Sequence, residues 1–193
     1  LEIKDRTEKY VLKLTAKGDS KPYNGATQSV TGYDENWNGL SGYTISGVSA
    51  GASGKDAATY ATSFSGLKTA VIKDASGKDV TSQFKVETED SNLVITPIAI
   101  TLSSESGSKE YDGTALTKPE VTQTGEFVTG EGFVKDSLQA TGSVLYAGEK
   151  ATNTIVYELA DGTKATNYTI TKQEGALEIK DRTEKYVLKL TAK

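Results

Sequence analysis

The sequence predicts an all-β fold arranged as two tandem domains, and three observations support this prediction. Glycine is abundant at 19 residues and proline scarce at 3, while Thr, Ser, Val and Tyr are frequent, which is typical of short strands joined by turns. Apolar residues alternate with polar ones along several segments, and no segment carries a sustained helical period of 3.6 residues. The third observation is repetition, which occurs on two length scales.

The longer repeat is exact. The first 17 residues, Leu1–Lys17, recur letter for letter as Leu177–Lys193, so the period is 176 residues. Units of α-solenoids and leucine-rich arrays run to only about 20 to 50 residues. A period of this length fits one or two independent domains of about 100 residues each. We expect the chain to hold one full period and the opening of the next.

A second and more diverged repeat lies inside the period. Tyr10–Gly25 aligns without a gap with Ile98–Gly113, at a constant offset of 88 residues. In both copies apolar residues occupy every second position before a turn, at Tyr10–Leu14 and at Ile98–Leu102. Alternation with period two predicts a half-buried strand in each copy.

The closing segments of the two halves also correspond. Phe84–Val86 followed by Leu93–Ile95 parallels Tyr168–Ile170 followed by Leu177–Ile179, and each pair predicts two strands joined by a short polar turn. The remaining predicted strands are Gly42–Val48, Ala58–Phe64, Lys68–Lys73, Gly142–Tyr146 and Asn153–Leu159. Both halves are therefore predicted to be small all-β domains, most simply Ig-like β-sandwiches in an elongated arrangement.

These alignments predict the domain boundaries. Residues 1–8 are expected to be the last strand of a preceding repeat and a linker, 9–97 the first Ig-like domain, 98–182 the second, and 183–193 the first strand of the next repeat. The duplicated 17-residue sequence is then a joint between domains. We expect its two orphaned strands, near the two ends of the sequence, to be disordered or to pair between neighbouring molecules. We also expect bending to concentrate at Lys180–Lys185.

The composition excludes several classes of function. The chain has no Cys, His or Met, so it has no thiol nucleophile, no imidazole base and no thiolate or imidazole ligand for a metal. Its net charge of −4 argues against nucleic acid as a partner. Apolar runs such as Leu93–Ile95 are far too short to span a membrane. Glu87 and Glu89 share one strand face and are predicted to be solubilising edge charges rather than glycosidase acids. We expect no enzyme activity, no cofactor and no metal.

Short motifs at both ends of each half carry a family resemblance. The sequences KPYNG at Lys21–Gly25 and KEYDG at Lys109–Gly113 resemble the K-x-Y-[DN]-G opening of YDG/MBG-type tandem repeats of bacterial surface adhesins. Ser91–Pro97 and Asn167–Ile179 are similar to the endings of that family. The resemblance implies extracellular Ig-like repeats, attached to the cell surface or wall through other parts of the parent protein. It further implies a non-catalytic stalk that projects a binding region.

The alternative function is binding. Each repeat could be a weak, multivalent module for mucin-like host glycans or for an extracellular host protein. Under either function, neighbouring repeats of the same chain are the immediate partners. No counterpart of Tyr33–Gly39 is evident in the second half of the sequence.

The opening motif has a simple physical interpretation. Its glycines permit positive φ in a turn, and its tyrosine rings can pack on a sheet edge. We therefore predict a structural role for eight residues: Lys21, Tyr23, Asn24, Gly25, Lys109, Tyr111, Asp112 and Gly113.

The candidate ligand site is the segment around the single tryptophan. Aromatic rings stand there beside carboxylates and amides, as a glycan site requires. Its candidate residues are Tyr33, Asp34, Glu35, Trp37, Asn38 and Tyr43. The same oxygens could bind calcium, although their spacing is not that of an EF-hand loop. The other interpretation is that Trp37 closes one end of the hydrophobic core and that the acids are only solvated.

Overall fold

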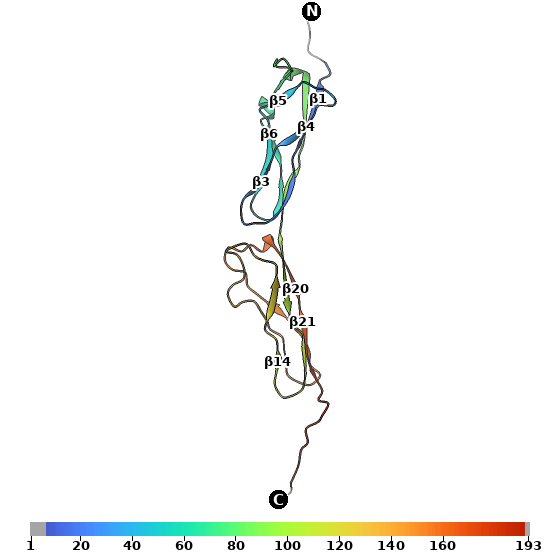
Figure 1. The fold of residues 1–193 in the computed structure, drawn as a ribbon, viewed down its shortest axis with the longest axis vertical. Helices are drawn as coiled ribbons and strands as arrows, with labels where there is room; N and C mark the ends of the chain where they lie inside the picture. Colours follow the sequence, from blue (N-terminus) through green and yellow to red (C-terminus); the bar gives the residue numbers. More distant parts are fainter. Residues whose placement is uncertain (1–6, 192–193) are drawn as a thin grey trace, which may run out of the picture. The chain divides into compact units, whose positions relative to one another are not determined.

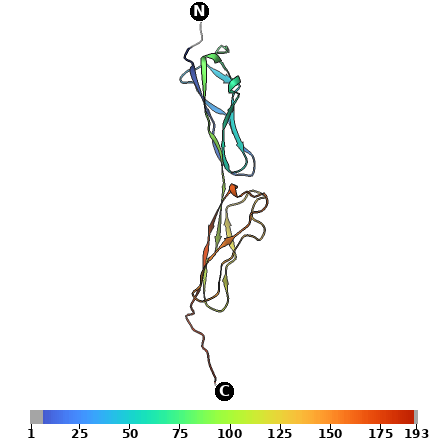
Figure 2. The same ribbon diagram turned by 180° about the vertical axis from the view of Figure 1, so that it is seen from behind.

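The computed structural model describes residues 7–191, and within this range the chain is all-β, with no α-helix. The chain divides into two compact units, Leu1–Pro97 and Ile98–Lys193 (Figures 1 and 2). The strand expected near the N-terminus, over Leu1–Lys4, lies outside the described residues. None of the described segments forms a helix long and apolar enough to cross a membrane.

The first unit is built from short strands and two 3₁₀ turns. Its strands are β1 (Tyr10–Ala16), β2 (Asp19–Pro22), β3 (Gln28–Thr31), β4 (Tyr33–Asn36), β5 (Thr44–Ser46), β6 (Ser49–Gly54), β7 (Ala58–Ala61), β8 (Ser63–Ser65), β9 (Val71–Lys73), β10 (Phe84–Glu89) and β11 (Asn92–Thr96). The 3₁₀ turns are η1 (Leu67–Thr69) and η2 (Thr81–Gln83). The sheets have the orders β10-β1-β4, β2-β11-β7, β3-β6-β8 and β5-β9.

The second unit follows a similar plan. Its strands are β12 (Ile98–Ser104), β13 (Gly107–Glu110), β14 (Leu116–Thr117), β15 (Val121–Thr124), β16 (Gln139–Ala140), β17 (Ser143–Val144), β18 (Lys150–Asn153), β19 (Ile155–Val156), β20 (Tyr168–Gln173) and β21 (Gly175–Lys180), with one 3₁₀ turn, η3 (Ala165–Asn167), in the described range. The sheets have the orders β15-β12-β20, β13-β21-β18, β14-β17 and β16-β19.

Both units share a frame in which the opening and closing strands run parallel. In the first unit Tyr10 of β1 faces Phe84 of β10, and in the second Ile98 of β12 faces Tyr168 of β20. The next strands repeat the relation, because β2 pairs in parallel with β11 and β13 pairs in parallel with β21. The strands predicted at both ends of each half are thus confirmed. Successive closing strands, such as β10 and β11, belong to different sheets.

The predicted middle strands of the first unit are too long. Gly42–Val48 contains only β5, and Lys68–Lys73 begins in the 3₁₀ turn η1 and holds only β9. Ala58–Phe64 is interrupted at Thr62, which is buried. The backbone N–H and the hydroxyl of Thr62 both donate to the carbonyl oxygen of Ser91, at 2.9 Å each, which breaks the strand into β7 and β8.

The middle of the second unit departs from prediction in the same way. Gly142–Tyr146 contains only the two residues of β17, and Asn153–Leu159 contains only β19 after the end of β18. The buried Asn153 is the physical reason, because its side chain binds the backbone of other segments and so ends β18. A buried polar side chain that must satisfy its hydrogen bonds overrides the local apolar pattern.

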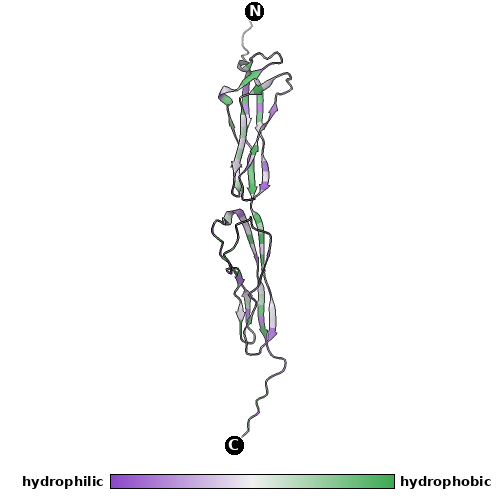
Figure 3. Cartoon of the chain, turned by 60° about the vertical axis from the view of Figure 1, so that its left-hand side comes forward, coloured by the Kyte–Doolittle hydropathy of each residue, from purple (hydrophilic) through white to green (hydrophobic). Residues whose placement is uncertain are grey.

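The core follows the alternation predicted for the opening strands. Leu12 and Leu14 of β1 are fully buried, as are Ile100 and Leu102 of β12, while Lys13 between the first pair is exposed. Figure 3 shows hydrophobic and hydrophilic residues following one another along the strands of each unit. Burying one such leucine or isoleucine side chain contributes about 1.5 to 3 kcal/mol, so the opening strand helps to hold each unit together.

The second copy of the opening-strand sequence has a different structure. Tyr186–Thr191 has the sequence of Tyr10–Thr15 but forms no strand. Its Leu188 is 81% exposed, whereas the matching Leu12 is fully buried. The same residues therefore form a strand only where neighbouring strands are present to pair with them.

Candidate functional site

The three aromatic residues of the predicted ligand site lie on the hydrophobic core of the first unit. The Trp37 ring stacks on Tyr43 at 5.9 Å between centroids and meets Phe84 edge-on at 5.6 Å. Tyr33, Trp37 and Tyr43 are partly buried and pack against the core cluster that contains Leu12. Burial raises the pKa of the Tyr33 hydroxyl, and the charge of Glu35 adds to this effect. We define Trp37, Tyr43 and Phe84 as the first-unit aromatic cluster.

The polar members of the predicted site bond to their own chain. The indole N–H of Trp37 donates to Oε2 of Glu35 at 2.9 Å, and Nδ2 of Asn38 donates to the carbonyl oxygen of Val11 at 2.9 Å. The Asp34 carboxylate lies 3.5 Å from Nζ of Lys17 in an exposed ion pair. These contacts fix the chain after β4. The indole N–H of Trp37 and the side-chain amide of Asn38 both donate to groups of the first unit itself.

The strand register supplies the counterpart of this segment that the sequence alignment did not find. Tyr33–Asn36 pairs antiparallel with β1, and Val121–Thr124 pairs antiparallel with β12 in the equivalent register. An aromatic side chain follows each of these strands. In the second unit it is Phe127, which lies 4.6 Å from Tyr168 between ring centroids.

The second unit therefore has its own aromatic cluster. Phe127 also contacts Phe133 edge-on at 4.9 Å between centroids. We define Phe127, Phe133 and Tyr168 as the second-unit aromatic cluster, in which Tyr168 takes the place of Phe84 in the shared frame. The two clusters thus occupy equivalent positions with different residues, and each is held by ring-to-ring contacts within its own unit. The sequence signal for the second cluster was the alignment of Tyr168 with Phe84.

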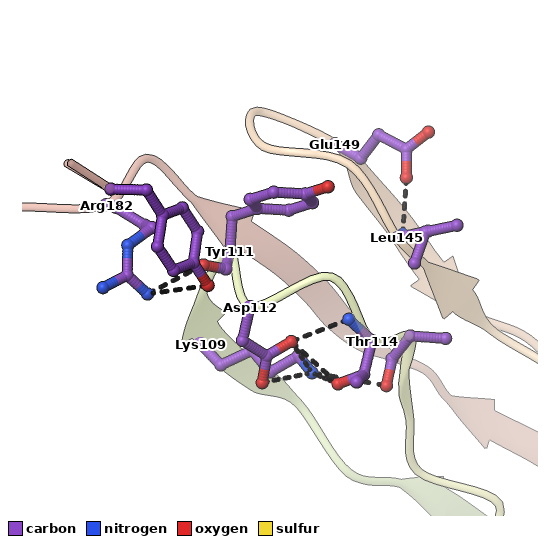
Figure 4. A network of polar contacts seen from close by, with 9 residues as sticks. Lys109, Tyr111, Asp112, Thr114, Leu145, Glu149 and Arg182 are labelled. Atoms are coloured by element: carbon purple, nitrogen blue, oxygen red, sulfur yellow. Dashed lines mark hydrogen bonds and ion pairs between the residues drawn. The ribbon is translucent and has the colours of Figure 1, made fainter. Parts of the chain in front are cut away.

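The K-x-Y-D-G motif of the second unit is a closed polar network (Figure 4). Nζ of Lys109 lies 2.9 Å from Oδ1 of Asp112 and 2.6 Å from the hydroxyl of Thr114. The backbone N–H of Thr114 donates to the same Asp112 oxygen at 2.8 Å. These donors, Lys109 first and Thr114 second, hold the pKa of Asp112 well below its ordinary value. Gly113 has φ of 85°, the conformation expected for the turn.

The first-unit motif uses different partners for its lysine. Asn24 has no charge to offer, and Lys21 lies 3.1 Å from Asp19 and donates to the carbonyl oxygen of Ser29 at 3.0 Å. Oδ1 of Asn24 accepts the N–H of Ala26 at 3.0 Å, and Gly25 has φ of 75°. Both motifs thus form the expected turn.

The motif tyrosines join the opening turn of each unit to its last strand. The backbone N–H of Tyr23 donates to the carbonyl oxygen of Thr96 at 2.8 Å, and that of Tyr111 donates to Lys180 at 2.9 Å. Tyr23 is buried, and Tyr111 packs against the core cluster of Val144. The contacts fit the structural role predicted for the eight motif residues.

The charged segment after β21 contacts the second-unit motif (Figure 4). Nη1 of Arg182 donates to the carbonyl oxygen of Tyr111 at 3.4 Å, and the guanidinium lies 4.2 Å from the Tyr186 ring centroid. The hydroxyl of Thr183 donates to the Glu110 carboxylate. Nearby, the Glu149 carboxylate accepts the backbone N–H groups of Leu145 and Tyr146, which lower the pKa of Glu149.

The paired carboxylates Glu87 and Glu89 are each bound to a lysine. Lys13 lies 2.7 Å from Glu89, and Lys85 lies 2.7 Å from Glu87. Hydrogen bonding to these lysines lowers the pKa of both carboxyl groups. A general acid at neutral pH requires the opposite shift. Among residues 7–191, no three acidic side chains lie together in a group that could hold a metal ion.

Comparison with known proteins finds no relative. No protein-family model matches the chain, and no curated protein or solved structure is significantly similar to it. The assignment to YDG/MBG-type repeats therefore stays a prediction from the motifs.

Proposed function

We propose that the chain is a non-catalytic repeat of a bacterial surface adhesin and acts as a stalk that projects a binding region. The observation that carries this proposal is that one strand frame occurs twice while its distinctive side chains are engaged within each unit. The Trp37 indole binds Glu35, and the motif residue Asp112 binds Lys109. A spacer needs stable, repeated domains, and it does not need a ligand site.

The proposal includes the finer features of the architecture. We propose that each unit is an Ig-like sandwich, that the units form an extended array, and that the array is extracellular. One residue, Pro97, separates β11 from β12 along the chain, and proline cannot extend a strand ladder through its nitrogen. The joint at Lys180–Lys185 is longer and charged, so the array should alternate a short joint with a more flexible one.

Small-angle X-ray scattering on chains of one, two and three periods tests the stalk. A stalk predicts that the largest dimension grows in proportion to the number of periods. Compact particles whose size grows with the cube root of the number of periods would contradict it. Spin labels on either side of each joint should report wider distance distributions across Lys180–Lys185 than across Pro97, and equal widths would contradict the alternation.

The binding alternative is separated by a second measurement. Mucin glycans should leave the fluorescence of Trp37 unchanged if the ring serves only to close the core. A saturable change in emission, lost in the Tyr43→Ala variant while the fold is retained, would instead favour a glycan-binding repeat.

A further inference from the structure

The segment Tyr186–Thr191 exposes an apolar strand sequence that has a defined binding position elsewhere in the same chain. Its Val187, Leu188 and Leu190 are 92%, 81% and 84% exposed. The identical sequence at Tyr10–Thr15 lies in strand β1. Exposed apolar side chains gathered over so short a segment are typical of a surface that binds a partner.

The position that receives this sequence lies between two strands of the first unit. β1 pairs in parallel with β10 from Tyr10↔Phe84 to Thr15↔Glu89, and antiparallel with β4 on its other side. Leu12 and Leu14 are fully buried in this position, at 0% accessibility each. Each copy of the chain thus carries one such position, which we call the β1 slot.

We propose that Tyr186–Thr191 is a donor strand that occupies the β1 slot of a second copy of this chain. The interaction is strand addition, in which backbone hydrogen bonds give affinity and alternate side chains fill pockets. Because the donor has the sequence of β1, it can make the same contacts with β10 and β4. Donor and slot are different surfaces, so each added copy displaces one resident β1 and presents its own donor, and the assembly grows head to tail.

Charge favours the β1 slot over the equivalent position in the second unit. In the β1 slot, Lys13 faces Glu87 across the ladder and lies 2.7 Å from Glu89. Lys189 of the donor would meet the same two carboxylates. At the β12 position the equivalent residue is Thr101, which faces Thr171, and Lys172 follows next on β20. The donor lysine would therefore find no carboxylate partner on the strand beside it.

Competition with the molecule's own β1 sets the conditions for exchange. β1 is joined to β2 through Lys17 and Gly18 alone, so its effective concentration at the slot is on the order of millimolar. Donor binding should therefore be rare in dilute protein and should increase when the resident strand is weakened.

The first test weakens the resident strand through its charge alone. Lys13→Glu places a third carboxylate beside Glu87 and Glu89 and leaves the apolar contacts of β1 intact. We expect K13E to form head-to-tail multimers at a concentration about fivefold lower than the unaltered chain, since an exposed charge pair contributes modestly. Adding Lys189→Glu to the donor should reverse this gain. Multimer mass is measured by light scattering after gel filtration.

The second test disables the resident strand and uses Trp37 as the reporter. The single Trp lies beside Phe84, and the adjacent Asn38 binds Val11 of β1. L12D/L14D should show unfolded-type emission when dilute and recover native emission as its concentration and mass rise together. L12D/L14D/L188D/L190D should recover neither, and L188D/L190D should remain a folded monomer.

A disulfide trap then locates the contact. Thr15 Oγ1 lies 3.3 Å from Oε2 of Glu89, and Thr191 takes the place of Thr15 in the donor. The chain has no cysteine, so E89C/T191C in the L12D/L14D background should give disulfide-linked multimers, and E89C alone should give none.

Three results would overturn the proposal. Multimers of the E89C/T191C variant that contain no disulfide between positions 89 and 191 would place the association elsewhere. Native emission from a monomeric L12D/L14D would assign the donor to its own molecule. Equal multimer formation by K13E and K13E/K189E would show that the donor strand plays no part.

Discussion

The side chain of Asn153 donates a hydrogen bond from Nδ2 to the carbonyl oxygen of Lys118 at 2.8 Å, inside the second unit. The same nitrogen donates to the carbonyl oxygen of Glu105 at 3.0 Å, and Oδ1 accepts the N–H of Gly142 at 3.1 Å. Asn153 is fully buried. One amide thus connects three separate segments of the second unit.

Asn153→Ala should therefore strongly destabilise the second unit. The change removes three hydrogen bonds and leaves two part-buried carbonyls and one part-buried N–H without these partners, which should cost about 3 kcal/mol. Amide hydrogen exchange in β12 and β21 measures the free energy of unfolding of this unit. Thr154→Ala, at the exposed next residue, is the control and should change it by less than about 0.5 kcal/mol. Similar values for the two variants would contradict the connecting role.

A pair of glycines in the first unit should respond very differently to the same substitution. Gly66 and Gly77 have φ of 78° and 83°, so alanine is strained at both. A Cβ at Gly66 would lie 1.8 Å from the carbonyl oxygen of Gly47, whereas a Cβ at Gly77 would meet nothing within 4 Å.

Gly77→Ala should cost about 1 kcal/mol from backbone strain alone. Gly66→Ala adds a clash with backbone and should cost about 3 kcal/mol or more. Urea unfolding followed by Trp37 fluorescence measures both variants in the same unit. Equal losses would mean that the turn at Gly66 relaxes away from Gly47.

The Lys109–Asp112 network predicts an acid-sensitive contribution to the stability of the second unit. The folded-state pKa of Asp112 is lowered, first by the hydrogen bond from Lys109 and then by those from Thr114. The folded state therefore binds its proton less readily than the unfolded state. The stabilisation is full above the ordinary carboxyl pKa of about 3.9 and is lost as the pH falls through the lower folded-state value.

Asp112→Asn should accordingly flatten the pH dependence of stability below pH 4. The unaltered second unit should lose more stability between pH 5 and pH 2 than the D112N variant loses. Asp161→Asn, at an exposed turn position of the same unit, should leave the slope close to that of the unaltered chain. A D112N slope as steep as that of D161N would show that the network does not persist in solution.

The predictability of this fold from sequence differs between strands for a physical reason. The opening and closing strands have large apolar residues at every second position, so Tyr10–Leu14 was found directly. β6, with the sequence SAGASG, has no such pattern and was missed. Its place is set by pairing with β3 and β8 on either side, and a single sequence carries no direct signal of such partners.

Alternation alone is also not sufficient for a strand. Tyr186–Thr191 has the same alternation as Tyr10–Thr15 and forms no strand. The difference lies in the neighbours, since Tyr10–Thr15 pairs with β10 and β4. The equivalence of Trp37 and Phe127 was missed for a related reason. Their flanking residues differ, and only the shared strand register brings each beside Phe84 or Tyr168.

This equivalence leads to a matched prediction about the two aromatic clusters. If Trp37 closes the core, then Trp37→Ala and Phe127→Ala should destabilise the first and second units by similar amounts. Both rings are partly buried, so we expect about 2 to 3 kcal/mol each, below the cost of removing a fully buried aromatic ring. Residue-resolved hydrogen exchange reports each unit separately within one intact chain.

A ligand-binding Trp37 predicts a different result. Residues kept for binding contribute little to folding, so Trp37→Ala would change the stability of the first unit by less than about 0.5 kcal/mol, while Phe127→Ala would still destabilise the second. Glu35→Gln separates the charge of Glu35 from its hydrogen bond, because an amide oxygen can still accept the indole N–H that Glu35 now accepts at 2.9 Å. We expect E35Q to keep the first unit within about 0.5 kcal/mol of the unaltered chain, since the ring contacts with Tyr43 and Phe84 remain.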